Sequence, residues 1–324
     1  MIYNTAVIGA GIAGLSLASR LAAKGQTVCL YEKSRGVSGR ASTRQLPEGS
    51  CDHGAQYMTA RHPDFQAQVT QWRADGVVAV WQPRLHVVDS PTDGAPTEQT
   101  TPTVRYVGTP KMTSPAAHLA ARLNVTLSTR IVRIERMGNR WALFDEAGSR
   151  TAEAQCLVFA IPPEQILPII GPHNPQWVDT VRASTMSPCW TVMATTEKCP
   201  PPPFDAAFVN RGPLTWIANN ASKPGRGTTP IWTLHATADW SRANIDIDPH
   251  DAAATLTAAF EEIAGVRVTN TVTHRWLYAK ADSPPNTRYL WDPLFKIGAI
   301  GDWLLQGNVE GAWLSGRFCA DEIM

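Results

Sequence analysis

Residues 6–14 of the chain read AVIGAGIAG, and this stretch decides the fold. A short apolar run that favours a β-strand ends at Gly9, and the apolar positions beyond Ile12 recur at helical spacing. Gly25 is a plausible helix stop. A second apolar run, at residues 27–31, ends directly before Glu32. Together these features predict a strand-helix-strand unit with a glycine-rich turn.

Each glycine of this turn has a separate physical role. Gly9 allows the tight turn, Gly11 leaves room for a pyrophosphate near the backbone, and Gly14 lets the helix and strand pack closely. The helix that starts at Ile12 and Ala13 directs unpaired N–H groups at the phosphates. The turn therefore predicts binding of the ADP part of a dinucleotide, and by itself it does not separate FAD from NAD.

The residues that follow the second strand favour FAD. Glu32 would accept hydrogen bonds from the adenosine ribose, and the next residues read KSRGVSGRAST. An NAD-binding unit does not need this glycine- and arginine-rich loop. Arg40 can neutralise pyrophosphate charge, and we include Lys33, Gly39 and Ala41 among the expected cofactor contacts.

The same loop resembles the Arg-x-Gly-Gly-Arg stretch of the amine-oxidase group of flavoproteins, with Ser38 in place of one glycine. DHGAQY at residues 52–57 resembles the Asp-x-Gly-Ala segment that meets the flavin ring in that group. Residues 301–312 resemble the group's C-terminal flavin motif. This resemblance implies bound FAD, contacted by Gly54, Ala55, Gln56, Tyr57, Val132, Asp302, Asn308 and Val309. We expect the FAD to be held non-covalently, because no cysteine lies just before Gly301.

A more specific combination of segments resembles the bacterial renalases: QYMTAR at 56–61, RYVG at 105–108, HRWLYA at 274–279 and GAWLSG at 311–316. Met58 stands where an aromatic residue is more usual. The resemblance implies an FAD-dependent oxidase that takes hydride from 2- and 6-dihydro isomers of NAD(P) and passes the electrons to O₂, giving H₂O₂. The expected substrate-site residues are Tyr57, Thr59, Arg61, Arg105, Trp190 and His235, although Trp190 and His235 also suit a buried core.

Two other functions stay open at this point. One is a flavin amine oxidase acting on a small primary or secondary amine, for which Lys280 is the only candidate for a lysine near the flavin. The other is a flavin-binding protein without turnover, because a fold never proves a function.

These features predict an α/β protein in which a Rossmann-like FAD-binding domain of the amine-oxidase type carries a second, mixed sheet-and-helix substrate domain. We expect residues 1–75, 109–163 and 282–324 to form the FAD-binding domain, and residues 76–108 and 164–281 to form the substrate domain.

Composition excludes several other classes. The 324 residues carry a formal net charge of +1, which gives no reason to expect a nucleic-acid partner. No apolar run approaches the roughly 20 residues that a membrane span needs. Six cysteines without a CxxC pair suggest no metal site, and the first residues lack the pattern of a secretory signal. We therefore expect a cytoplasmic enzyme with a small-molecule substrate and O₂ as partners, of undetermined oligomeric state.

Overall fold

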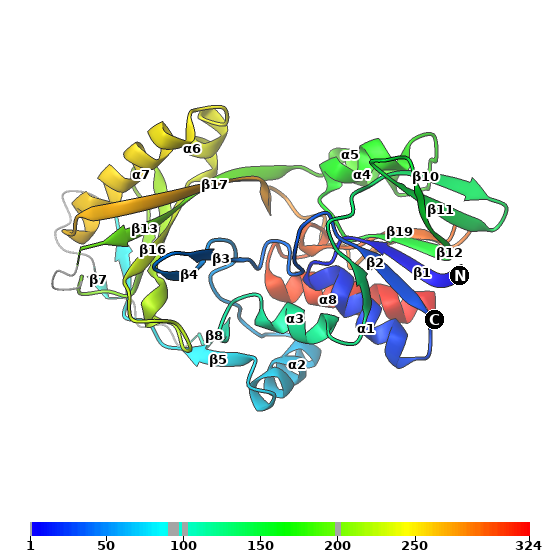
Figure 1. The fold of residues 1–324 in the computed structure, drawn as a ribbon, viewed down its shortest axis with the longest axis horizontal. Coiled ribbons are helices and arrows are strands. Elements are labelled where there is room, and N and C mark those ends of the chain that lie inside the picture. Colours follow the sequence, from blue (N-terminus) through cyan, green and yellow to red (C-terminus); the bar gives the residue numbers. More distant parts are fainter. Residues whose placement is uncertain (1, 90–96, 99–102, 198–201) are drawn as a thin grey trace.

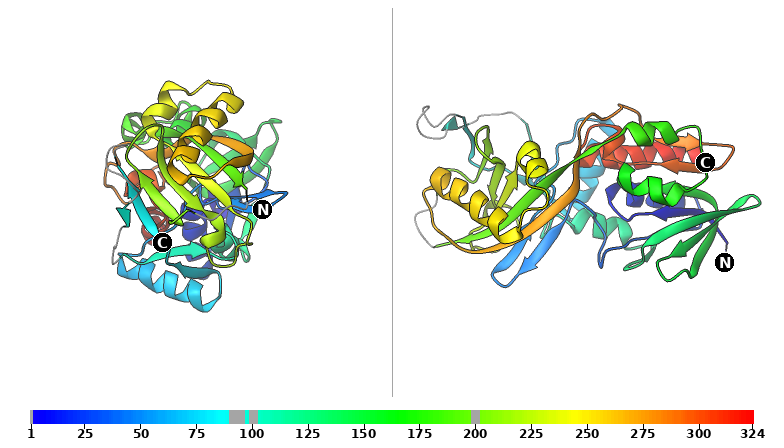
Figure 2. Two further views of the ribbon diagram at one scale, coloured as in Figure 1. Left: turned by 90° about the vertical axis from the view of Figure 1, so that its left-hand side faces the viewer. Right: turned by 90° about the horizontal axis from the view of Figure 1, so that it is seen from above.

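The computed structural model describes residues 2–89, 97–98, 103–197 and 202–324, which form two lobes built on separate β-sheets. The molecule is elongated, and the lobes lie side by side (Figure 1). Two long strands, β13 (Met186–Thr196) and β17 (Val268–Ala281), run from the second lobe toward the first (Figures 1 and 2). The site described below lies where the lobes meet.

The first lobe contains an eight-stranded sheet. Strand β1 lies at its centre, parallel to β2 on one side and to β12 on the other. Strand β12 also pairs with β11, which pairs with β10, so these strands form an antiparallel meander. The strands of this sheet are β1 (Ile2–Ile8), β2 (Val28–Tyr31), β9 (Asn124–Thr126), β10 (Ile131–Met137), β11 (Arg140–Asp145), β12 (Arg150–Phe159), β18 (Leu290–Asp292) and β19 (Ile297–Ala299).

Helices cover both faces of this sheet, because successive side chains of a strand point to opposite faces. Val7 of β1 packs in one apolar cluster with α1 (Ile12–Ala23) and α8 (Val309–Ile323). Its neighbours Ala6 and Ile8 pack in a second cluster with α4 (Pro163–Ile170) and α5 (Val178–Ala183). The predicted strand-helix-strand unit is thus confirmed.

The second lobe contains a seven-stranded sheet in the order β17-β13-β16-β15-β14-β6-β7. The helices α6 (Ala238–Ala243) and α7 (Pro249–Ala264) cover one of its faces, and the other face is turned toward the first lobe (Figure 1). Its remaining strands are β6 (Leu85–Val88), β7 (Thr97–Glu98), β14 (Ala206–Val209), β15 (Leu214–Asn219) and β16 (Ile231–Ala236).

Shorter elements fill the space between the two sheets. The hairpin of β3 (Thr43–Leu46) and β4 (Gly49–Asp52) lies under the second sheet, and β5 (Val78–Trp81) pairs with β8 (Arg105–Gly108). The remaining elements are α2 (Pro63–Ala74), α3 (Ser114–Ala120) and the short 3₁₀ helices η1 (Asn220–Ser222) and η2 (Asp302–Leu304).

The packing corrects one part of the expected domain division. We expected residues 164–281 to belong to the substrate domain, but Ile166 of α4 and Val181 of α5 are buried in the apolar cluster of the first sheet. The amphipathic helix α4 follows directly after β12, so the chain covers the first sheet before it crosses to the second. The rest of the division stays a prediction. Among the described residues, no helix has the length and apolarity required to cross a membrane.

Candidate cofactor and substrate site

The glycine-rich turn has the geometry that its sequence predicts. Gly9 has φ +107°, a conformation that favours glycine, and a Cβ atom at Gly14 would lie 2.2 Å from the Gly9 carbonyl oxygen. A Cβ atom at Gly11 would meet nothing within 4 Å, so the space above it is open. Glu32 is buried, and its Oε2 accepts a hydrogen bond of 2.9 Å from the backbone N–H of Ala10. The acid therefore lies directly beside the turn.

The second predicted loop packs onto the first. Ser38, which replaces a glycine of the family pattern, has φ +101°, and its backbone N–H donates to the Ala10 carbonyl at 2.9 Å. Gly39 approaches Gly11 so closely that a Cβ atom there would lie 3.4 Å from the Gly11 Cα. Segments that are far apart in the sequence thus form one continuous backbone surface.

The segment at residues 54–55 extends this surface. The Ala55 N–H donates to the Arg40 carbonyl at 2.9 Å, and a Cβ atom at Gly54 would lie 1.9 Å from the same oxygen. Only glycine therefore fits at position 54. Ala41 is buried just behind the loop.

The C-terminal motif meets Arg40 from the opposite side. The Arg40 guanidinium makes a bidentate ion pair with the Asp302 carboxylate, in which Nη1 lies 3.1 Å from Oδ2 and Nη2 contacts Oδ1. It also donates to the Ala279 carbonyl at 3.1 Å. Asn308 caps α8, because its Oδ1 accepts a hydrogen bond of 2.7 Å from the Gly311 N–H, and Val309 is the first helical residue. Arg40, Asp302 and the start of α8 therefore lie close together.

Three other expected cofactor residues lie near this surface in different ways. Lys33 is exposed and its Nζ lies 3.4 Å from Gln165 Oε1. Val132 lies in β10, at a register shift of the β10–β11 pair. This strand begins shortly after Thr129, and the Thr129 N–H donates a hydrogen bond to the Glu32 carbonyl. The Gln56 side chain is engaged with protein atoms, since its Nε2 donates to the Asp52 carbonyl at 2.7 Å.

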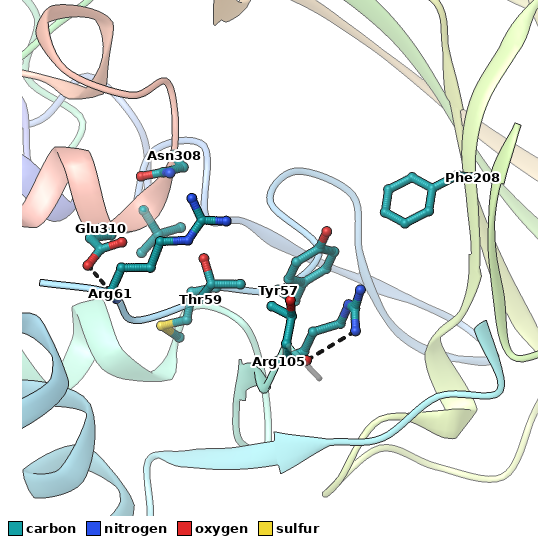
Figure 3. A pocket seen from close by; sticks show the side chains of 10 residues that line it. Tyr57, Thr59, Arg61, Arg105, Phe208, Asn308 and Glu310 are labelled. Atoms are coloured by element: carbon teal, nitrogen blue, oxygen red, sulfur yellow. Dashed lines mark hydrogen bonds between the residues drawn. The ribbon is translucent and has the colours of Figure 1, made fainter. Parts of the chain in front are cut away.

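A pocket of about 420 Å³ adjoins this surface, and Tyr57, Thr59, Arg61 and Arg105 all line it. Figure 3 shows these side chains between the start of α8 on one side and β14 on the other. The described lining consists of Tyr57, Met58, Thr59, Arg61, Thr103, Arg105, Phe208, Asn308, Val309 and Glu310. The pocket therefore joins expected substrate residues to the expected flavin residues Asn308 and Val309.

Aromatic side chains surround Tyr57 at the second lobe. Its ring centroid lies 5.6 Å from that of Trp216 and 6.2 Å from that of Trp81, and the Arg105 guanidinium carbon lies 5.4 Å from its ring centre. Phe208 packs against Trp216 at 4.9 Å. Neither Phe208 nor Trp216 was among the expected site residues, because both reach the site from a separate sheet.

Glu310 is a site residue that the sequence analysis missed. It is only 1% exposed, and its Oε1 accepts hydrogen bonds from the backbone N–H groups of Arg61 at 2.8 Å and His62 at 2.6 Å. Its Oε2 is buried and has no hydrogen-bond partner among the described residues. Its position directly after Val309 in the first turn of α8 is the signal that could have identified it.

Trp190 does not reach the pocket, so its expected stacking role is corrected. It is 2% exposed, its Nε1 donates to the Asn244 carbonyl at 2.9 Å, and it belongs to the apolar cluster beneath α6 and α7. The physical reason is strand alternation: Trp190 and the neighbouring Thr191 point to opposite faces of the second sheet.

His235 lies on the face that is turned toward the first lobe, next to the flavin segment. One of its ring nitrogens, Nε2, lies 3.2 Å from the His53 carbonyl oxygen, which also accepts a hydrogen bond of 3.0 Å from Trp276 Nε1. Burial lowers the pKa of His53 and that of His235 from 6.5 to about 4, with the neighbouring His274 as a further cause for His53. Both imidazoles are therefore neutral at pH 7, beside rather than within the described pocket lining.

These observations fit a bound FAD. The open space above Gly11 borders the backbone surface of three loops, which suits a pyrophosphate. The buried, unpartnered Glu310 Oε2 and the start of α8 lie at the other end, where a polar ring system would find hydrogen-bonding atoms. Among the described residues, no group of three or more His, Cys, Asp or Glu side chains could hold a metal ion.

Comparison with known proteins agrees with this fold. Residues 7–72 match the family model of the NAD(P)-binding Rossmann-like domain. The whole chain superposes on putrescine oxidase bound to putrescine, with a TM-score of 0.76, 13% identity, and coverage of 100% of this chain and 99% of that one. A putative protoporphyrinogen oxidase from Exiguobacterium sp. 255-15 has a TM-score of 0.77 at 12% identity, with 98% of both chains covered. The protein therefore has a mixed α/β fold with a Rossmann-like dinucleotide-binding domain, and it shares its overall architecture with these oxidases.

Proposed function

We propose that the protein is a cytoplasmic FAD-dependent oxidase that takes hydride from 2- and 6-dihydro isomers of NAD(P), regenerates NAD(P)⁺ and passes the electrons to O₂ to give H₂O₂. The observation that carries the proposal is the pocket in which Tyr57, Thr59, Arg61 and Arg105 adjoin Asn308 and Val309. Bound FAD would supply the hydride acceptor there.

The charge of the pocket supports an anionic substrate. Among the described lining residues, Arg61 and Arg105 are cationic and Glu310 is the only carboxylate. Such a lining attracts the phosphates of a dinucleotide and disfavours a protonated amine. Arg61 and Arg105 can both donate charge-assisted hydrogen bonds to phosphate or carboxamide oxygens.

The remaining lining supports orientation of a flat ring. Tyr57, with Trp81 and Trp216 behind it, offers an aromatic wall, and Thr59 offers a hydroxyl group. Hydride transfer from an electron-rich dihydropyridine needs alignment and exclusion of water more than acid-base help. The proposed role of these residues is therefore binding and positioning.

Stopped-flow reduction under anaerobic conditions tests the proposal. The purified yellow protein is mixed with the 2-, 4- and 6-dihydro forms of NAD and NADP, and flavin absorbance is followed. We expect fast bleaching with the 2- and 6-dihydro isomers and release of the oxidised dinucleotide. Bleaching by the 4-dihydro form alone, or by none of them, would refute the substrate assignment.

An amine oxidase is the second candidate, and the architecture shared with putrescine oxidase favours it. Lys280 is the lysine considered for a place near the flavin in an amine oxidase. It is exposed, and it lies beside Gly307, since a Cβ atom at Gly307 would be 3.7 Å from the Lys280 Cγ. The same stopped-flow experiment separates the two candidates when small primary and secondary amines are included. Rapid bleaching by amines and none by dihydronicotinamides would reverse our ranking.

A further inference from the structure

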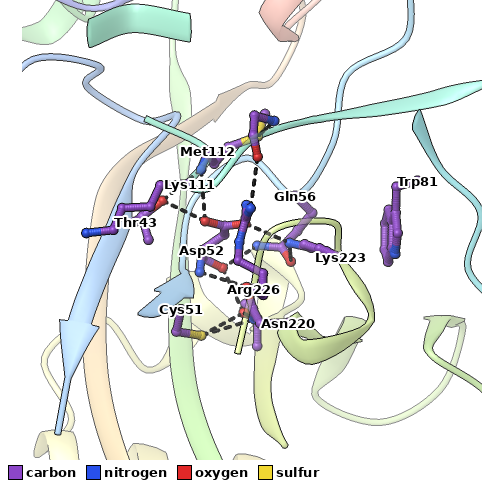
Figure 4. Close-up of polar contacts among 12 residues, drawn as sticks. Thr43, Cys51, Asp52, Gln56, Trp81, Lys111, Met112, Asn220, Lys223 and Arg226 are labelled. Carbon is purple, nitrogen blue, oxygen red and sulfur yellow. Dashed lines mark hydrogen bonds and ion pairs between the residues drawn. The ribbon is translucent and has the colours of Figure 1, made fainter. Parts of the chain in front are cut away.

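A buried charge cluster lies beneath the segment that meets the proposed flavin, and we name Asp52, Lys223 and Arg226 the buried ion cluster (Figure 4). Asp52 Oδ2 lies 3.2 Å from Lys223 Nζ and 2.6 Å from Arg226 Nη2, and all three side chains are at most 1% exposed. Asp52 Oδ1 accepts further hydrogen bonds from Thr43 Oγ1 at 2.6 Å and from the Met112 N–H at 3.2 Å. The proposed function does not use this cluster.

The cluster is connected to the flavin segment through Gln56. Lys223 Nζ donates to Gln56 Oε1 at 3.1 Å, and Gln56 Nε2 donates to the carbonyls of Asp52 at 2.7 Å and Gly54 at 3.0 Å. Lys223 therefore helps to set the backbone of residues 52–56, which abuts the Arg40 loop. Because Lys223 and Arg226 follow β15, the second lobe contributes to the shape of the cofactor surface.

The charges of the cluster do not balance. Burial alone would raise the pKa of Asp52, but the adjacent Lys223 and Arg226 hold it below its usual 3.8, so the carboxylate is ionised. Burial lowers the pKa of Lys223 from its usual 10.5, and the neighbouring Arg226 lowers it further, while Asp52 opposes both effects. When all three groups are charged, Asp52 neutralises only one of its two cationic partners. Lys223 also lies 5.4 Å from the ring centre of Trp81, whose π-face offers weak compensation. A buried charge is costly unless an opposite charge approaches it, so the surplus favours negative charge arriving nearby.

From this geometry we infer that Lys223 and Arg226 are positioning residues whose surplus positive charge, next to the Gly54–Tyr57 segment, raises the reduction potential of the bound flavin. The inference rests on the proposed function only in requiring bound FAD. The physical basis is that reduction adds negative charge to the cofactor, and a cation in a poorly solvated environment stabilises added negative charge strongly.

Measurement of the flavin midpoint potential by equilibration with reference dyes tests this inference without turnover. Lys223→Met and Arg226→Gln each remove the surplus charge, and we expect both to lower the potential. Lys223→Arg keeps the charge and should restore the wild-type value. Lys24→Met makes the same charge change at an exposed position and should leave the potential unchanged.

The outcomes separate a charge effect from a merely structural one. Two neutral variants are included because either could fail to fold, and one folded neutral variant that retains FAD suffices. If that variant binds FAD and its flavin has the wild-type midpoint potential, the inference is overturned, even when the variant is less stable than the wild-type protein. If the wild-type protein binds no FAD, the proposed function fails, and the inference fails with it. An unchanged potential in a yellow variant leaves the proposed function standing.

Discussion

The two faces of the second sheet differ sharply although they are made by the same strands. The face beneath α6 and α7 is an apolar core that includes Trp190, Trp232 and Phe260. The opposite face presents Trp216 and His235 toward the first lobe, close to Tyr57 and His53. Successive side chains of a strand point to opposite faces of the sheet, and this alternation produces the difference. An aromatic residue in one of these strands therefore lies either in the core or at the site, depending on the face to which its side chain points.

Two neighbouring residues of β13 show this alternation directly. Trp190 and Thr191 are neighbours in β13, yet Trp190 contacts α6 while Thr191 pairs with His235 on β16. Local sequence identifies the strand, but the side on which the first lobe lies decides which residues can meet a ligand. The predictions below test how separate the two faces are.

The largest effect is expected at the far face. Trp190→Ala should lower the free energy of unfolding by about 3–5 kcal/mol, because it leaves a cavity in the core and removes one of the hydrogen bonds to the Asn244 carbonyl. Urea unfolding measures this loss. The flavin spectrum and the kcat/KM of the folded fraction should stay at wild-type values, and a specific loss of activity in stable protein would place Trp190 in the site after all.

Arg105 tests the pocket that the near face helps to enclose. Arg105→Gln should raise KM for dihydronicotinamide dinucleotides, with a loss in kcat/KM of about 10- to 100-fold, which corresponds to about 1.5–3 kcal/mol for a charged hydrogen bond. Steady-state kinetics at several salt concentrations measures it. Arg73→Gln, on the exposed surface of α2, is the matched control. Equal effects of the two variants would show that only general charge attraction is involved.

The glycine-rich turn offers a contrast between folding and binding within the first lobe. Gly14→Ala should destabilise the protein by about 1–3 kcal/mol, because the added methyl group would collide with the Gly9 carbonyl. Gly11→Ala should leave the stability of the cofactor-free protein unchanged, since nothing lies within 4 Å, and should weaken FAD binding. Thermal unfolding with and without FAD distinguishes them, and normal FAD affinity in Gly11→Ala would contradict the proposed pyrophosphate position.

The smallest effect concerns the neutral histidines at the near face. His53 and His235 have pKa values of about 4 in the folded protein, against 6.5 when unperturbed. Above pH 6.5 both histidines are neutral in the folded protein and in the unfolded chain, so the full stability of the folded protein is present. As the pH falls from 6.5 toward 4 the unfolded chain takes up protons that the folded protein does not. Stability should fall by at most about 1.4 kcal/mol per pH unit for each histidine.

Urea unfolding between pH 4 and 7.5 measures this slope, and His235→Gln should make it shallower. A slope that is the same in the variant and in the wild-type protein would show that His235 does not contribute.

The sequence predicted the strand-turn-helix and its glycine-rich turn correctly, and the cofactor contacts of the surrounding loops stay predictions. The turn at residues 9–14 and the position of Glu32 beside it follow from a motif whose spacing reflects local backbone geometry. The ion pair between Arg40 and Asp302 was not predicted, because it joins segments that are far apart in the sequence. The pocket residues Tyr57, Thr59 and Arg61 were found because they continue such a motif. Phe208, Glu310 and the buried ion cluster were missed, because their significance arises only from partners that are remote in the sequence.

The strand-turn-helix, the class of dinucleotide that it suits and the start of the C-terminal helix follow from the amino-acid sequence alone, because glycine conformations and helix ends are local properties. Only the tertiary structure decided which face of the second sheet is turned toward the pocket, that Trp190 is core, and that α4 and α5 cover the first sheet. It also decided that Lys223 and Arg226 converge on Asp52. Burial and charge pairing depend on distances between separate segments, and those distances exist only once the two lobes have packed together.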